Sequence, residues 1–213
     1  MRETTGDPHA GQPVIRRGPF LAHARLVVIL VHGRGGSATD MLGLADQFDV
    51  TGDIAYLAPQ AAGQTWYPYS FLTPIHQNEP GISSGLRVIG GLVDAAGEQG
   101  VPADRVVILG FSQGACLTLE FAARHARRYR GVVGLSGGLI GPPGTPRDYR
   151  GSFDGTPTFL GCSDIDPHIP MERVRESAEV FRRLGATVDE RIYPGMEHTV
   201  SRDEIEAINV LLA

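Results

Sequence analysis

Short runs of apolar residues alternate with longer amphipathic segments along most of this chain of 213 residues. The run Leu-Val-Val-Ile-Leu-Val at 26–31 is apolar at every position, which is typical of a strand buried on both faces of a parallel sheet. Similar runs predict further strands at 54–57, 105–109, 131–135, 158–160 with its flanks, and 188–193. Helical periodicity predicts helices at 37–48, 83–98, 113–128, 171–184 and 203–212. This alternation predicts an α/β fold, with a mostly parallel twisted sheet covered by helices on both faces.

The length favours one domain over residues 1–213, because the chain can bury one sizeable core but hardly two. Neither an internal repeat nor a linker interrupts it. Residues 14–16 and 20–23 suggest an edge hairpin that turns at 17–18. Leu139 and Ile140, beside a Pro-Gly stretch, are expected to form an apolar surface patch that serves as a homodimer contact or a pocket rim.

Composition and charge exclude several classes of function. With 19 basic and 24 acidic residues the formal net charge is −5, which does not favour nucleic acid as a partner. Cys116 and Cys162 lie in apolar stretches and are expected to be buried free thiols. No stretch is apolar enough for a signal peptide or a membrane span, so we expect a cytoplasmic protein, although a chain stripped of its leader would look the same. The dispersed histidines predict no metal site, and nothing predicts a cofactor.

The segment Gly-Phe-Ser-Gln-Gly at 110–114 fits the G-x-S-x-G pattern, in which a serine is exposed on a sharp turn between a strand and a helix. A second match, Gly-Leu-Ser-Gly-Gly, occurs at 134–138. An apolar run precedes Ser112 and helix-forming residues follow it, whereas two prolines soon after Ser136 forbid an immediate helix. Ser112 is therefore the predicted nucleophile, and its context is that of an α/β-hydrolase.

A nucleophilic serine requires hydrogen-bond donors for the oxyanion. The backbone N–H of Gln113 follows the serine directly, and Arg34 lies in the glycine-rich segment His-Gly-Arg-Gly-Gly at 32–36, after a predicted strand. Both are predicted oxyanion donors. The alternative, a phosphate-binding loop of a dinucleotide fold, lacks the third glycine of that fingerprint.

The remaining triad members follow the serine in the order acid, then histidine. His198 lies in a Pro-Gly loop after the last predicted strand and is the predicted general base. Asp164 and Asp166 both follow the strand predicted near 158–160, and spacing does not choose between them. His168 is too near these aspartates to be the base that they orient, and an exposed or pocket-lining position is expected for it.

Together these segments resemble the phospholipase/carboxylesterase family, which includes bacterial carboxylesterases and acyl-protein thioesterases. The resemblance rests on Val-His-Gly-Arg-Gly at 31–35, the serine segment, Asp-Ile-Asp-Pro-His-Ile-Pro at 164–170 and Tyr-Pro-Gly-Met-Glu-His at 193–198. It implies that the acid is Asp166, the aspartate before proline, and that Arg34 and Gln113 supply the oxyanion donors. The family often carries His-Gly where this chain has Cys162 and Ser163, so hydrogen bonds around this loop are expected to differ.

The resemblance also implies that the aromatic-rich loop at 64–72 is a wall of the acyl pocket, although a packed Ω-loop would look the same. The predicted substrate contacts are Trp66, Tyr67, Phe71, Leu139 and His168. With no room for a separate lid domain, we expect an open cleft for small or medium esters or thioesters. The alternatives are peptidase or perhydrolase chemistry on the same triad, and a non-catalytic ligand-binding protein of the same fold; nucleotide binding lacks its glycine and acidic signals.

Overall fold

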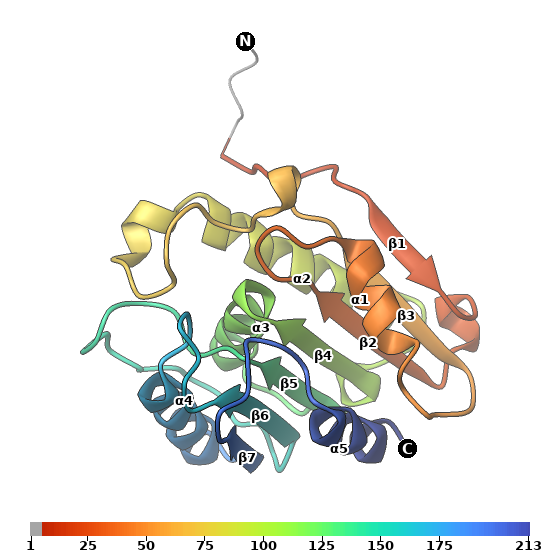
Figure 1. Ribbon diagram of the computed structural model, residues 1–213. Helices are drawn as coiled ribbons and strands as arrows, with labels where there is room; N and C mark the ends of the chain where they lie inside the picture. Colours follow the sequence, from red (N-terminus) through yellow and green to blue (C-terminus); the bar gives the residue numbers. More distant parts are fainter. Residues whose placement is uncertain (1–5) are drawn as a thin grey trace.

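A seven-stranded sheet forms the centre of the protein, whose computed structural model describes residues 6–213 (Figure 1). The strand order is β1-β3-β2-β4-β5-β6-β7. Only β1 runs antiparallel, paired with β3, and every other neighbouring pair is parallel. The strands are β1 (Val14–Arg17), β2 (Leu26–Val31), β3 (Ile54–Pro59), β4 (Val106–Phe111), β5 (Gly131–Leu135), β6 (Pro157–Ser163) and β7 (Thr187–Tyr193). The predicted α/β-hydrolase architecture is confirmed; residues 1–5 of the predicted domain lie outside the described part.

Four α-helices of the described residues lie between strands: α1 (Ala38–Ala45), α2 (Gly81–Glu98), α3 (Gln113–Arg124) and α4 (Met171–Arg183). A fifth, α5 (Arg202–Leu212), follows the last strand. Two of these helices begin with a capping box, in which the serine before the helix and an acidic residue three positions later bond to each other's backbone N–H. Ser37 and Asp40 form the box of α1, and Ser201 with Glu204 forms that of α5. None of the helices in residues 6–213 is long and apolar enough to cross a bilayer.

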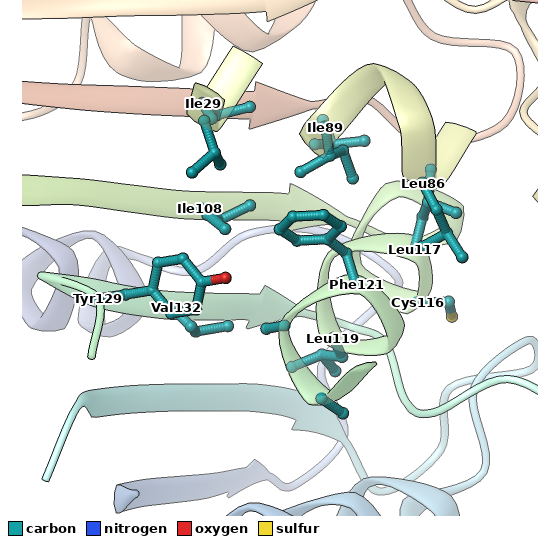
Figure 2. Close-up of a cluster of buried hydrophobic side chains, with 14 of the residues drawn as sticks. Ile29, Leu86, Ile89, Ile108, Cys116, Leu117, Leu119, Phe121, Tyr129 and Val132 are labelled. Carbon is teal, nitrogen blue, oxygen red and sulfur yellow. The ribbon is translucent and has the colours of Figure 1, made fainter. Parts of the chain in front are cut away.

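The inner strands β2 to β5 bury both of their faces, on which successive side chains alternate, whereas the edge strands β1 and β7 are partly exposed. All six residues of β2 are buried. Val27, Ile29 and Val31 pack with α2, α3 and α4, while Leu26, Val28 and Leu30 pack with α1 and α5. In Figure 2, side chains of β2, β4 and β5 face Leu117 and Phe121 of α3. Helices therefore cover both faces, with α3 almost entirely buried.

The predicted edge hairpin is wrong. β1 pairs with β3, and Leu21–His23 forms a 3-10 turn closed by hydrogen bonds from His23 N to Phe20 O (2.9 Å) and from Ala24 N to Leu21 O (3.0 Å). Pro19 has no N–H for a strand ladder, and the chain must reverse at once to begin β2, so a turn replaces the second hairpin strand.

Two further expectations need correction. Helix α3 ends at Arg124 rather than at 128, because the N–H of Tyr129 already bonds Thr156 Oγ1 (2.9 Å) as the chain enters β5. Leu139 and Ile140 form no surface patch, since both are 0% exposed. Their side chains pack into the core on the α3 and α4 side of the sheet, and their N–H groups bond Ser177 and Glu120.

Substitution of Gly114 by alanine is expected to destabilise the protein by about 3 kcal/mol, as an overpacked site does when the obstructing atoms cannot move. A Cβ at Gly114 would overlap the backbone carbonyl oxygen of Val31, where α3 packs on the end of β2. Urea unfolding measures the effect. Gly91→Ala on the exposed side of α2 is the control, because its Cβ meets nothing within 4 Å and alanine favours a helix by about 1 kcal/mol. Equal stability of the two variants would contradict the packing argument.

Candidate active site

Ser112 occupies the sharp turn between β4 and α3. Its backbone has φ 54° and ψ −119°, a conformation that residues other than glycine rarely adopt. The turn is held by hydrogen bonds from Ser112 N to Leu135 O (2.9 Å) and from Cys116 N to Ser112 O (3.0 Å). A Cβ at Gly110 would overlap the backbone of Gly114, so glycine is needed where the chain crosses itself. The strain exposes the serine hydroxyl at the carboxyl edge of the sheet.

A hydrogen-bonded chain joins three side chains from three different strand ends. His198, in the loop after β7, places Nε2 2.9 Å from Ser112 Oγ. Its Nδ1 lies 2.6 Å from Oδ2 of Asp166, in the loop after β6. The rings of Phe111 and His168 flank the imidazole at centroid distances of 5.0 and 5.1 Å. An imidazole held in this way can take the hydroxyl proton of the serine while the carboxylate fixes its tautomer.

Asp166 is held in its ionised form by hydrogen bonds. Its Oδ1 accepts the backbone N–H groups of His168 (2.8 Å) and Ile169 (3.0 Å). Burial of the carboxylate opposes ionisation, but the bond with His198 and these two N–H groups outweigh it and lower the pKa of Asp166. A negative charge is therefore present beside Nδ1 at neutral pH.

Asp164 has a different partner. Its Oδ1 accepts the N–H of Gly195 (2.8 Å), so it fastens the loop that carries His198 without touching the ring. The two aspartates that spacing could not separate thus bind different parts of one loop.

The residues that replace the family's His-Gly also support this site. Cys162 Sγ lies 3.9 Å from Asp166 Oδ2, and the N–H of Ile165 donates to Ser163 Oγ (3.1 Å). Burial, with the nearby Asp166 charge, raises the pKa of the Cys162 thiol to about 12. The thiol therefore stays protonated and can donate toward the carboxylate. Both cysteines are buried and unpaired, as predicted.

The glycine-rich loop after β2 lies against the serine. A Cβ at Gly33 would stand 3.2 Å from that of Ser112, so only glycine permits this approach without displacement. Neither Arg34 nor Gln113 donates its backbone N–H to an acceptor within residues 6–213. Both groups are free to receive a developing negative charge, and Gln113 additionally stands at the N-terminus of α3.

A cleft of about 550 Å³ opens beside these residues. Of the predicted substrate contacts, Tyr67, Phe71 and His168 line it. Trp66 and Leu139 do not; both are 0% exposed, and the Trp66 indole N–H donates to the His32 carbonyl (2.9 Å). Pro68, Tyr69 and Ser70 of the predicted wall at 64–72 also line the cleft, together with two residues that were not predicted, Cys116 and Ile169. Of these, Cys116 follows Ser112 by one helical turn, a spacing that could have identified it.

Ser136, the competing serine, also has a positive φ, 50°. It is 0% exposed, and its hydroxyl finds no hydrogen-bond partner among the described residues. No histidine activates it there. Within the same described part, no group of three His, Cys, Asp or Glu side chains is arranged to hold a metal ion.

Two buried histidines support the start of the aromatic loop. His32 Nε2 accepts the N–H of Ala61 (3.0 Å), and His9 Nδ1 accepts that of Ala62 (3.2 Å). An imidazole can accept only while that nitrogen is unprotonated. Burial lowers the pKa of both His9 and His32, so both are neutral at physiological pH.

Acidification through about pH 6.5 is expected to destabilise the protein through His9 and His32. Unfolded histidines have a pKa near 6.5, so the unfolded state takes up protons at a higher pH than the folded state does, and stability is lost as the pH falls. Thermal unfolding at about pH 7.5 and 5.5 measures the loss. The pH-dependent drop in Tm should shrink in His9→Asn and persist in His76→Asn, whose histidine is exposed. An unchanged drop in His9→Asn would contradict the assignment.

Comparison with known proteins places this geometry among related chains. A family model described as phospholipase/carboxylesterase matches residues 21–213. Acyl-protein thioesterase 1 of Debaryomyces hansenii is 28% identical over 221 residues, covering 93% of this chain and 95% of that protein. The protein of the same name from Schizosaccharomyces pombe is 27% identical, covering 89% and 90%.

Solved structures of carboxylesterases share the fold of this chain. A phospholipase/carboxylesterase from Dyadobacter fermentans superposes with a TM-score of 0.91 at 41% identity, covering 95% of this chain and 97% of that one. The carboxylesterase of Bacillus cereus has a TM-score of 0.72 at 16% identity, covering 95% and 94%, and shares the fold.

Proposed function

This chain belongs to the phospholipase/carboxylesterase family, and from that premise we propose that it cleaves carboxylic esters or thioesters of small or medium acyl groups through an acyl-enzyme on Ser112. Because its relatives are named as thioesterases and carboxylesterases, the chain is an ester-hydrolysing enzyme. The observation that carries the proposed mechanism is the chain of contacts from Ser112 Oγ to His198 (2.9 Å) and from His198 to Asp166 (2.6 Å).

Acylation begins when Ser112 Oγ attacks the carbonyl carbon of the ester and His198 Nε2 takes the hydroxyl proton. The carbonyl oxygen becomes an oxyanion, which the backbone N–H groups of Arg34 and Gln113 stabilise. The tetrahedral intermediate then collapses, the bond to the leaving oxygen or sulfur breaks, and His198 returns the proton to the leaving group. Asp166 stabilises the imidazolium in between.

Deacylation repeats these steps with water. His198 removes a proton from a water molecule that attacks the acyl-serine, the oxyanion forms at the same two N–H groups, and Ser112 leaves with the proton. The product is a carboxylic acid. The protons are transferred by a hydroxyl and an imidazole that a carboxylate orients, and each of these groups is within hydrogen-bond distance of the next.

The lining of the cleft supports the proposed substrate size. Its volume of about 550 Å³ lies within the range of small-molecule sites. Tyr67, Phe71 and Ile169 contribute apolar atoms to the lining, which contains no carboxylate. The guanidinium of Arg34 also lines the cleft, but its N–H groups are donated to the backbone carbonyls of residues 67–69. Uncharged acyl groups of small or medium size fit this surface best.

A cytoplasmic location and a homodimer stay predictions of the sequence.

The experiment that tests this proposal combines measurements of ester hydrolysis with covalent labelling of the nucleophile. Hydrolysis of p-nitrophenyl esters from acetate to laurate, and of an acyl thioester, tests the reaction and sizes the pocket. An alkyl fluorophosphonate, located by peptide mass spectrometry, tests the nucleophile. We expect turnover of shorter esters and a phosphonyl group on Ser112. A folded protein that neither hydrolyses any ester nor takes up the probe would favour the non-catalytic ligand-binding alternative. Faster cleavage of peptides than of esters would favour a peptidase, and peracid formation faster than ester hydrolysis would favour a perhydrolase.

A further inference from the structure

The side chain of Arg34 makes contacts that its backbone role does not require. Nη1 donates to Pro68 O (2.8 Å) and Thr65 Oγ1 (3.3 Å). Nη2 donates to Tyr67 O (2.9 Å) and Tyr69 O (2.7 Å). Three consecutive carbonyls, 67–69, thus converge on one guanidinium, which pairs with no carboxylate among residues 6–213.

Gln113 holds the same loop from the helix side. Its Oε1 accepts the N–H of Trp66 (2.8 Å), and its Nε2 donates to Tyr67 O (2.8 Å). The Tyr67 carbonyl therefore accepts from both residues whose backbone N–H groups are the proposed oxyanion donors. The same two residues thus hold the loop with their side chains and offer their backbone N–H groups to the oxyanion.

The loop that they hold is a wall of the cleft. Tyr67, Pro68, Tyr69 and Phe71 line it, yet residues 65–71 form no helix or strand that would satisfy their backbone groups. Backbone carbonyls that accept no hydrogen bond within a helix or sheet need other donors, and the shape of such a segment depends on where those donors lie. Here Arg34 provides them at 67–69.

We propose that Arg34 is a positioning and specificity-determining residue, whose side chain fixes the wall at 65–71 to the glycine-rich loop at 32–36. The fit of the acyl group and the geometry of the oxyanion donors are then set together. This inference rests on the proposed function. The guanidinium suits the task because its planar fork presents several donors in fixed directions, whereas a lysine ammonium is a compact charge with three donors. Charge alone would not reproduce the arrangement.

The test compares Arg34→Lys and Arg34→Met with Arg25→Met. Arg25 is a matched control, because it is also exposed and donates from Nη2 to two backbone carbonyls, those of Thr51 and Leu212, neither of which lines the cleft. Three measurements are made on each full-length variant: kcat and KM over the p-nitrophenyl ester series, hydrogen exchange of the segment 65–71, and acrylamide quenching of Trp66. Trp66 is the single tryptophan of the chain, so its fluorescence reports on this loop alone.

Both Arg34 variants should lose about 10- to 100-fold in kcat/KM for the preferred ester, as a small misplacement of reacting groups does. The loss should be smaller for acetate, so that the chain-length preference flattens, while segment 65–71 exchanges faster and Trp66 becomes more accessible to the quencher. Arg25→Met should match the wild type in all three. Thermal unfolding identifies any variant that fails to fold, in which case the other Arg34 variant carries the comparison.

Wild-type selectivity and exchange in Arg34→Lys would overturn the inference, because charge alone would then suffice. An equal loss for every ester with unchanged exchange and quenching would overturn it as well. Failure of the proposed function looks different: the fluorophosphonate would label a residue other than Ser112 in the wild type, and the exchange and quenching results would still stand.

Discussion

Replacement of Ser112 by alanine is expected to lower kcat for p-nitrophenyl esters by about 10⁶-fold, the loss that follows removal of the nucleophile from a serine triad. Alanine leaves the binding cleft and both proposed oxyanion donors in place, so KM should change little. The hydroxyl that it removes is the group within 2.9 Å of His198 Nε2, and no other serine has such a contact among residues 6–213. Steady-state kinetics with a burst-phase measurement give both values.

Ser136→Ala is the matched control, since Ser136 lies in the same sequence pattern, follows the neighbouring strand β5 and shares the positive φ. Its hydroxyl is buried without a partner, so its loss should leave turnover and stability nearly unchanged. Substantial turnover by Ser112→Ala, or its loss in Ser136→Ala, would refute Ser112 as the nucleophile.

Substitution of Asp166 by asparagine is expected to reduce kcat by about 10⁴-fold near neutral pH, the cost of the corresponding change in a serine protease triad. The amide oxygen can still accept the N–H groups of His168 and Ile169 where Oδ1 does now. The amide NH₂ would then face His198 Nδ1, favour the tautomer with its proton on Nε2, and leave that nitrogen unable to accept the proton of Ser112. The pH–rate profile and the fluorophosphonate labelling rate measure the change.

Asp164→Asn provides the control for charge and loop stability. Its amide oxygen can keep the bond to the N–H of Gly195, and its side chain does not contact the imidazole. We expect less than about a 10-fold change in kcat, as for loss of a charge that makes no contact with the reacting groups. If Asp164→Asn proved more damaging than Asp166→Asn, the acid would have been assigned to the wrong residue.

Much of the fold could be predicted because its signals are local. The run at 26–31 is apolar throughout and forms the buried strand β2 with the predicted bounds. The capping box of Ser37 and Asp40 likewise depends on residues three positions apart. The predictions were wrong where a residue distant in the sequence decides the structure. β1 pairs with β3, so residues 20–23 have no strand to pair with. The contact between Tyr129 and Thr156 accompanies the early end of α3.

By itself the sequence determined the α/β architecture, the strand-to-helix turn at Ser112 and the order of the candidate triad, because apolar periodicity, glycine placement and chain order are properties of neighbouring residues. Residue spacing left the choice between Asp164 and Asp166 open, the family resemblance favoured Asp166, and the tertiary structure brings that residue to His198. Only the tertiary structure decided that Tyr67 and Phe71 line the cleft while Trp66 and Leu139 do not, and that the Arg34 side chain holds the loop at 65–69. Those outcomes depend on contacts between residues about 30 or more positions apart, whose directions are set by how separate strands and loops pack together and not by the spacing of residues along the chain.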